Sequence, residues 1–216
     1  MRRHPLFAAR SIGRGVVAVT AAALLVCVVG CGGTLVVRAP QEPQAHAESV
    51  LGQIAPLAIA VPPATGAAAA ADPLGERAGG WGRRGGDIAL TEHPGSLVHR
   101  VVVQQLEQAG HRVVAADPDV VLGIHVLEFA VDAPRAGRGW DVTVSIQVAL
   151  RVEREPGSEA WSEFVYSTES TGHTLAPPGL AIVERILGEA VRGLASGVAG
   201  REALAAALQR LGSTAG

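Results

Sequence analysis

The chain has 216 residues, 48% of them hydrophobic, which is enough for one domain with a buried core after a targeting segment is removed. All 18 basic residues are arginine, and four of them precede Cys31, where no acidic residue occurs. The other 14 arginines stand against 20 carboxylates, a formal charge of −6. A domain of this charge is repelled by phosphate backbones and by anionic bilayers, which argues against a nucleic-acid partner.

The N-terminus has the three parts of a secretory signal. An arginine-containing leader precedes an uncharged run at 16–29 that is too short to span a bilayer comfortably. The run ends in Val28, Val29 and Gly30, directly before Cys31. This order resembles the lipobox of bacterial lipoproteins, in which a cysteine takes a diacylglyceryl group on its sulfur. The resemblance implies a signal peptide of residues 1–30, a diacylglycerol and an N-acyl chain on Cys31, and no other cofactor.

An alternative is that residues 16–37 form an uncleaved membrane helix in which Cys31 is an ordinary apolar residue. Gly30, Gly32 and Gly33 argue against it, because glycine is a poor helix former. Cys27 follows a valine, which makes it a poorer acylation site, and it would leave with the signal peptide. The mature chain would then have one acylated cysteine and no disulfide.

The acyl chains would hold the domain at a membrane without spontaneous release. Gly32, at the second position of the mature chain, is not the aspartate that resembles an inner-membrane retention signal. We therefore expect the periplasmic face of the outer membrane, with the inner or plasma membrane as the alternative.

Residues 31–53 are predicted to be the lipidated N-terminus and an extended polar tether, and order is expected from residue 54. A first strand is predicted at 56–61, ended by Pro62 and Pro63. Alanine-rich and glycine-rich stretches without an apolar period follow, so 62–94 is predicted to be a long irregular loop.

Two chemical interpretations of this loop are weak. Its glycines and arginines lack the GxxxxGK[ST] order of a phosphate-binding loop. Asp87, His93 and Ser96 have the residue types of a catalytic triad, but closeness in sequence does not fix geometry. Ser96 is better interpreted as the N-cap of the following helix.

The remaining elements follow clear periods. Apolar spacing predicts a helix at 96–109, then a short strand at 111–115, a turn at 117–119 and a strand at 120–129. After a hairpin loop at 133–139, the strand at 142–152 alternates apolar with polar residues, which indicates an open antiparallel sheet with one wet face. A strand at 160–171, a helix that begins at Pro177 and Pro178, and a helix at 201–211 complete the chain.

This order predicts an α+β fold: a two-layer α/β lipoprotein domain at 54–212, with helices packed on one face of a mostly antiparallel sheet. The lipobox, the tether, the helix ending LEQAGHRVV, the meander and the two last helices together resemble the YajG-type outer-membrane lipoproteins. More loosely, they are similar to the PqiC-type auxiliary lipoproteins of bacterial lipid transport. The glycine-rich insertion departs from that pattern.

The chain shows no pattern typical of a catalyst. It has neither a GxSxG elbow nor a metal-ligand spacing such as HExxH, so we expect neither an enzyme nor a metal site. His125 and Glu128 are three apart on a strand and should point to opposite faces. The carboxylates Asp141, Glu163 and Glu169 fit a solvated face. The seven histidines are His4, His46, His93, His99, His111, His125 and His173.

Three functions are consistent with these features. The first is a non-catalytic accessory subunit, anchored in the envelope, that binds a protein partner in envelope or lipid transport through its sheet or the 62–94 loop. The second is binding of a lipid or small apolar ligand, for which Trp140, Trp161, Phe164 and Tyr166 are the bulky candidates. Aromatic residues make up only 3% of the chain, which disfavours a ligand pocket. The third is a structural envelope lipoprotein. The ligand-binding residues are therefore unknown.

Overall fold

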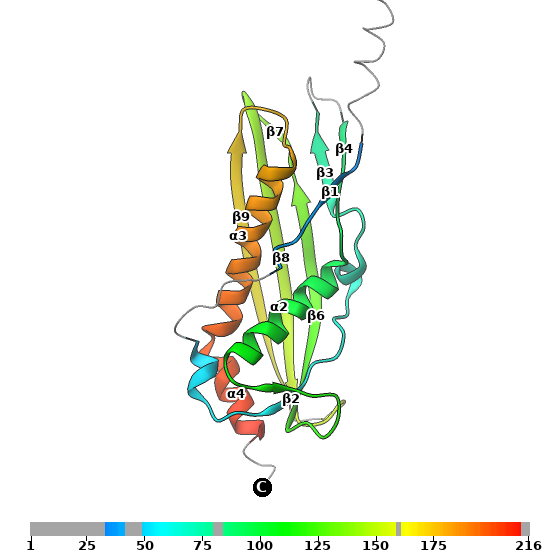
Figure 1. Ribbon diagram of the computed structural model, residues 1–216. Helices are drawn as coiled ribbons and strands as arrows, with labels where there is room; N and C mark the ends of the chain where they lie inside the picture. The colour runs from blue at the N-terminus through cyan, green and yellow to red at the C-terminus, as the bar shows by residue number, and fades with distance from the viewer. Residues whose placement is uncertain (1–32, 42–48, 80–83, 159–160, 213–216) are drawn as a thin grey trace, which may run out of the picture.

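The computed structural model describes residues 33–41, 49–79, 84–158 and 161–212. Strands form one layer, and helices α2 (Pro94–Gln108), α3 (Leu180–Ala199) and α4 (Glu202–Gly212) lie against one of its faces (Figure 1). This arrangement confirms the predicted α+β class. The helices begin and end within a few residues of the predicted positions, because each has a continuous apolar face.

The larger sheet is built on three long antiparallel strands in the order β6, β8, β9. Short β2 runs parallel to β5 and to the start of β6 at one side, and β7 pairs with the start of β8. The strands are β2 (Ala58–Ala60), β5 (Arg112–Val113), β6 (Val120–Asp132), β7 (Arg135–Ala136), β8 (Gly139–Glu153) and β9 (Trp161–Thr174).

A second sheet has the order β1 (Leu35–Val37), β4 (Arg84–Leu90), β3 (Gly75–Ala78). β1 runs parallel to β4, and β3 runs antiparallel to it. The Ala78 N–H donates to the carbonyl oxygen of Ala133 at 2.9 Å, which joins β3 to the chain just after β6. The second sheet therefore continues the layer of the first.

The predicted irregular loop at 62–94 is wrong where the structure places regular elements in it. It contains the 3-10 helix η2 (Ala67–Ala70), β3, β4 and the first residue of α2. Glycine is used here for close approach: a Cβ on Gly75 would overlap the carbonyl oxygen of Val131, and one on Gly85 would lie 2.6 Å from the Gly79 nitrogen. Ile88 is fully buried and ties β4 to the core.

The predicted tether at 31–53 is also wrong for the part that the structure describes. β1 is paired with β4, and the 3-10 helix η1 (Val50–Gln53) packs beside the domain through Leu51, which is fully buried. Residues 42–48 lie outside the described ranges. The folded domain therefore begins before residue 54.

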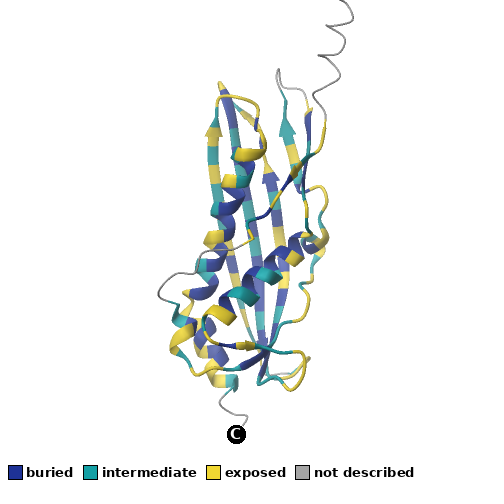
Figure 2. Ribbon diagram, in the orientation of Figure 1, coloured by how far each residue is buried: buried dark blue, intermediate teal, exposed yellow. Residues whose placement is uncertain are grey.

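The core lies between the sheet and the helices, as the buried inner faces in Figure 2 show. On β8 every second residue from Val142 to Val152 is buried, whereas Thr143, Ser145 and Gln147 on the other face are half-buried. The predicted alternation is confirmed. Helix α3 packs closely on β9, since a Cβ on Gly193 would overlap Thr168 Oγ1.

The start of α2 differs from its prediction. The helix begins at Pro94, with His93 in the N-cap position and no side-chain capping bond. Proline fits the first turn because its missing N–H would have no intrahelical partner there. Ser96 lies inside the first turn and is exposed, so its predicted capping role is wrong.

Candidate functional site at the N-terminal segment

Residues 33–41 form a strap that is held along its length by the domain. We call these residues the N-terminal strap. Its β-branched residues Thr34, Val36 and Val37 favour an extended strand, and Val37 is fully buried. The pairing with β4 continues past the strand, where the Thr91 N–H donates to the carbonyl oxygen of Val37 at 3.0 Å.

The first described residue of the strap is fixed by a guanidinium. Arg77 on β3 donates from Nη2 to the carbonyl oxygen of Gly33 at 3.1 Å and from Nη1 to that of Pro178 at 3.4 Å. One side chain therefore brings the start of the strap next to the residues that precede α3. Further along, the Arg38 N–H donates to Glu184 Oε1 on α3 at 3.2 Å.

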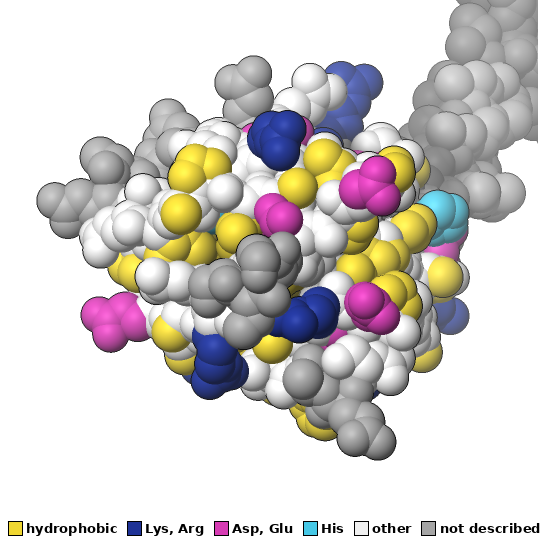
Figure 3. All heavy atoms as spheres, turned by 90° about the horizontal axis from the view of Figure 1, so that it is seen from below, with side chains coloured by type: hydrophobic (Ala, Val, Ile, Leu, Met, Phe, Trp, Pro, Cys, Tyr) yellow, Lys and Arg dark blue, Asp and Glu magenta, His cyan; other side chains and the backbone are white. Residues whose placement is uncertain are grey.

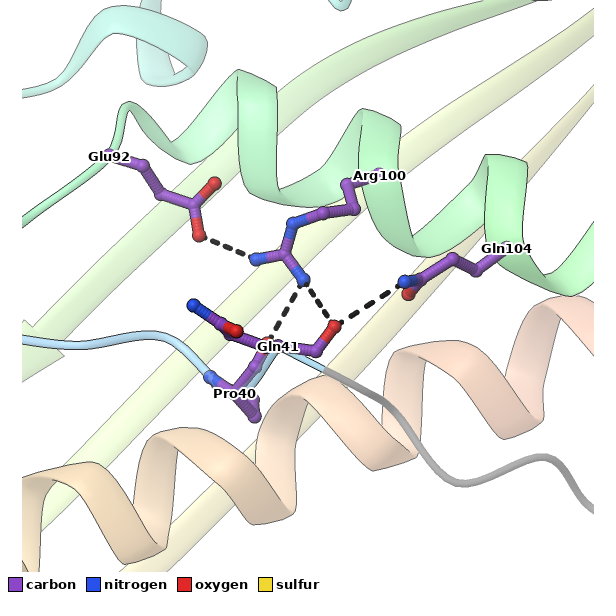
Figure 4. Close-up of polar contacts among 5 residues, drawn as sticks. All are labelled: Pro40, Gln41, Glu92, Arg100 and Gln104. Atoms are coloured by element: carbon purple, nitrogen blue, oxygen red, sulfur yellow. Dashed lines mark hydrogen bonds and ion pairs between the residues drawn. The ribbon is translucent and has the colours of Figure 1, made fainter.

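The end of the strap is held by α2 (Figure 4). Arg100 Nη1 donates to the carbonyl oxygens of Pro40 and Gln41, each at 3.0 Å. Its Nη2 forms an ion pair with Glu92 at 2.5 Å, and Gln104 Nε2 donates to Gln41 at 3.4 Å. Arg100 and Glu92 are 28% and 31% exposed, so solvent screens the pair only in part.

A cleft of about 540 Å³ lies between the strap and α2. Its lining includes Arg38, Gln41, Thr91 and the Glu92–Arg100 ion pair. These groups are hydrogen-bonding side chains. The arrangement is suited to holding a backbone segment in one position.

No sequence motif predicts a role for Arg77, Arg100 or Glu184. Arg100 and Gln104 are four apart, so helical spacing could have placed them on one face of α2. Nothing in the sequence shows that this face meets residues 40 and 41, because the bonds go to carbonyl oxygens that every residue carries.

The predicted lipidation residues precede the strap in the sequence. Val28, Val29, Gly30 and Cys31 are outside the described residues, and Cys31 is two positions before Gly33. The alternative membrane helix at 16–37 is wrong over its described part, since 35–37 is a strand. Within the described ranges, the helices lack the length and apolar character that crossing a bilayer needs.

The residues of the candidate triad do not come together. Asp87 on β4 accepts a hydrogen bond from Arg84 at 2.8 Å. His93 and Ser96 instead border a pocket of about 410 Å³ between η2 and the start of α2, where small residues such as Gly66 and Ala69 form much of the wall. His99, in the same wall, donates from Nε2 to the carbonyl oxygen of Val61 at 3.0 Å.

His111 is the most buried histidine of the described chain, at 4% exposure. Its Nδ1 accepts from the Leu57 N–H and its Nε2 donates to the carbonyl oxygen of Leu51, both at 3.2 Å. Burial lowers the pKa of His111, and the bond to Leu51 opposes that effect more weakly. His111 is therefore a structural residue. In the part that the structure describes, no three His, Cys, Asp or Glu side chains form a group that could hold a metal ion.

The four aromatic candidates for a ligand pocket are not gathered at one place. Trp140 is buried and donates from Nε1 to the carbonyl oxygen of Ala78 at 2.8 Å. Trp161 is half exposed on the open face, under the guanidinium of Arg151 at 4.5 Å. Phe164 and Tyr166 pack toward the core beneath the helices. None of the four lines either of the two pockets described above.

Comparisons with known proteins extend the description of the fold. A scan against protein-family models finds no match, and a search of curated proteins finds no significant match. Among solved structures, a Xanthomonas campestris protein of family DUF330 matches 79% of this chain and 95% of its own, with a TM-score of 0.55 and 14% identity. A proposed lipoprotein from Caulobacter crescentus matches 50% of this chain and 84% of its own, with a TM-score of 0.29 and 21% identity.

The Xanthomonas structure shows that the chain has the fold of a DUF330 protein, since the match covers nearly all of that chain. DUF330 is a PqiC-like family, so the looser of the two predicted resemblances agrees with the comparison at the level of fold. The YajG-type assignment is not confirmed.

Proposed function

We propose that the chain is an envelope lipoprotein that is anchored through acyl chains on Cys31 and serves as a non-catalytic accessory subunit in envelope or lipid transport. The observation that carries this proposal is the N-terminal strap. From Gly33, two positions after Cys31, the chain is part of the fold, so an anchor on that cysteine would hold the whole domain in place.

The spacing makes the anchor short. Cys31 is two positions before Gly33, whose carbonyl is fixed, and two residue steps of extended chain span at most about 7 Å. A domain on so short a connection stays at the membrane surface with a limited choice of orientations. Such restriction suits a subunit that presents one surface to a membrane-bound partner more than it suits a domain that diffuses on a long tether.

The predicted location is the periplasmic face of the outer membrane, and the YajG-type assignment remains a prediction. The likeness to a DUF330 protein supports the proposal as far as the fold. Binding of an apolar ligand between sheet and helices has less support, because inward residues such as Val144 and Ile186 fill that space and are at most 1% exposed. A purely structural envelope lipoprotein remains the alternative.

Mass measurement of the mature protein tests the anchor. When the full chain is expressed in a bacterium with lipoprotein processing, its N-terminal peptide should start at Cys31 and carry the mass of a diacylglyceryl and an N-acyl group. Cys31→Ser should lose that mass and remain unprocessed. The matched control Cys27→Ser should be processed normally, because Cys27 leaves with the signal peptide. Acylation that persists in Cys31→Ser would contradict the proposal.

Affinity purification from cross-linked membranes tests the accessory role. The full-length protein should bring down components of a lipid or envelope transport system, identified by mass spectrometry, and Cys31→Ser should lose them. Recovery of bulk envelope proteins alone would reject transport and leave the structural alternative. A bound lipid in stoichiometric amount would instead support ligand binding.

A further inference from the structure

We propose that the end of the domain formed by the β9–α3 connection and the β7 turn lies on the bilayer surface, with Leu175 and Leu180 in contact with lipid. This inference rests on the proposed function, because it places the anchored cysteine beside that end. It adds a defined orientation and a lipid-contacting surface to the anchored domain.

The position of the strap locates the membrane. Arg77 holds the carbonyls of Gly33 and Pro178 on one guanidinium, so the chain from Cys31 reaches the domain next to the start of α3. The chain from Cys31 to Gly33 spans at most about 7 Å. A bilayer that holds the acyl chains of Cys31 therefore lies close to this end of the domain. Figure 1 shows β1 starting at the same end as the tips of β3 and β9 and the start of α3.

The most exposed large hydrophobic side chain of the described chain is at this end. Leu175 is 75% exposed, and Leu180, in the first turn of α3, is 42% exposed. Ala176 and Pro177 between them are exposed as well. Single exposed leucines are ordinary on protein surfaces. Two leucines beside the attachment point of an acyl anchor are placed to enter the lipid interface.

Two arginines lie at the turn next to the end of β9. Arg135 and Arg138 are exposed at the β7 turn, and that turn adjoins the end of β9 through the pairing of Trp140 with Thr174. Asp132 is exposed at the same turn, and Asp141 is paired with His173 at 2.7 Å. Arginines near the headgroups are attracted to anionic lipids. Against the two carboxylates named here, the two arginines leave this end without the net negative charge of the whole domain.

The opposite end of the molecule is excluded by its distance from the anchor and not by its composition. Seen from below, it carries arginines, carboxylates and hydrophobic side chains interspersed with one another (Figure 3). That end lies far from the start of the strap (Figure 1). A contact with lipid there would need a longer connection to Cys31 than the strap leaves free.

Single introduced cysteines can test the orientation in the full-length lipoprotein. The proposed mature chain has no free thiol, so Leu175→Cys, Leu180→Cys and Val165→Cys would each carry one fluorescent label. Val165 is a matched control, because its exposed fraction of 44% is close to the 42% of Leu180. It lies on β9 ten residues before Leu175, about 33 Å away along the strand. Each labelled protein is reconstituted into phosphatidylethanolamine and phosphatidylglycerol vesicles that contain a lipid with a nitroxide headgroup.

The expected result is a loss of more than half of the fluorescence at 175 and 180, and little loss at 165, because nitroxide quenches only near contact. Equal, weak quenching at all three positions, or stronger quenching at 165, would overturn the proposed orientation. The unsubstituted chain separates the two proposals. If it takes no label and stays with the vesicles, the anchor stands whatever the quenching shows; if Cys31 takes label, the anchor itself fails and the orientation falls with it.

Discussion

Arg100 on α2 holds the carbonyl oxygen of Gln41 at 3.0 Å, although 59 residues separate the two in the chain. The same nitrogen binds the carbonyl of Pro40, and the other terminal nitrogen pairs with Glu92. One charged side chain therefore closes the end of the N-terminal strap onto the helix layer. A planar guanidinium can make these bonds together, whereas an ammonium group cannot make them in the same geometry.

Arg100→Leu should release the end of the strap. Hydrogen bonds to a charged group contribute about 1.5–3 kcal/mol when buried, and this site is partly exposed, so we expect a loss of about 1–2 kcal/mol in the free energy of unfolding. Amide hydrogen exchange in β1 should rise more than exchange in β8. Urea denaturation with hydrogen exchange by mass spectrometry measures both.

Two variants control for charge and for packing in this experiment. Arg100→Lys keeps the charge and should still loosen β1, because it cannot hold Glu92 and both carbonyls. Gln104→Ala removes one long bond of 3.4 Å and should have a smaller effect than either. Unchanged β1 exchange in both Arg100 variants would show that the pairing with β4 alone holds the strap.

His111 should make the protein less stable in mild acid. The Leu57 N–H points at Nδ1, so the native ring stays neutral, and burial lowers its pKa below the ordinary 6.5. Below pH 6.5 the unfolded chain binds a proton that the native protein refuses, so the free energy of unfolding falls by up to about 1.4 kcal/mol per pH unit until the native pKa is reached. Denaturation at a series of pH values between 7.5 and about 5 would measure this slope.

Replacement of the ring separates this effect from other acid-sensitive groups. His111→Gln should be less stable at neutral pH, because it disturbs the bonds to Leu51 and Leu57, and it should lose most of the slope below pH 6.5. The same slope in His111→Gln would assign the acid sensitivity to another group.

The long elements could be predicted from the sequence because their periods are unambiguous. The alternation from Val142 to Val152 and the apolar face of α3 each repeat over many residues. β4 was missed because two of its seven residues are glycines, which indicate a loop and close packing equally well. β1 was missed because its three apolar residues begin only five positions after the predicted signal peptide and resemble it in composition.

The site was less accessible to sequence reasoning than the fold. Arg77 binds a carbonyl 44 residues away, and Glu184 accepts from a backbone N–H 146 residues away. Backbone groups carry no residue identity, so a pattern of side chains cannot reveal such contacts. The aromatic candidates illustrate the converse: Trp161 and Tyr166 are near in sequence, but the pleat of β9 sends them to opposite faces.

Gly193 should tolerate no side chain, because its α-carbon faces Thr168 on β9. Gly193→Ala places a Cβ against Thr168 Oγ1 and should lower the free energy of unfolding by about 1–3 kcal/mol. Gly188→Ala on the same helix is the matched control. A Cβ there meets only the mobile end of Arg192 at 3.6 Å, so helix propensity should raise stability by up to about 1 kcal/mol.

A double variant tests whether the clash with Thr168 is the cause. Thr168→Ala removes the overlapping hydroxyl, so Gly193→Ala should cost much less in the Thr168→Ala background than alone. Urea denaturation of the four proteins gives the coupling free energy directly. Simple additivity of the two changes would mean that another feature of the helix, and not this contact, requires glycine.

Tyr166 is the only tyrosine of the chain, so its titration can be followed without interference from another phenol. Burial raises its pKa to about 12, and the positive charge of Arg201, 5.4 Å from the ring centroid, opposes the shift. The tyrosinate absorbance of the native protein should therefore appear near pH 12 and not near pH 10. Because the unfolded chain loses this proton first, stability should fall as pH rises from about 10 towards 12.

Two substitutions test the causes of that shift separately. Arg201→Ala removes the opposing charge and should move the titration of Tyr166 to still higher pH. Tyr166→Phe removes a buried hydroxyl that has no hydrogen-bond partner among the described residues, so stability at neutral pH should stay equal or rise by up to about 1 kcal/mol. A large loss of stability in Tyr166→Phe would show that the hydroxyl is hydrogen-bonded in solution, and a native titration near pH 10 would show that water reaches it beneath α3.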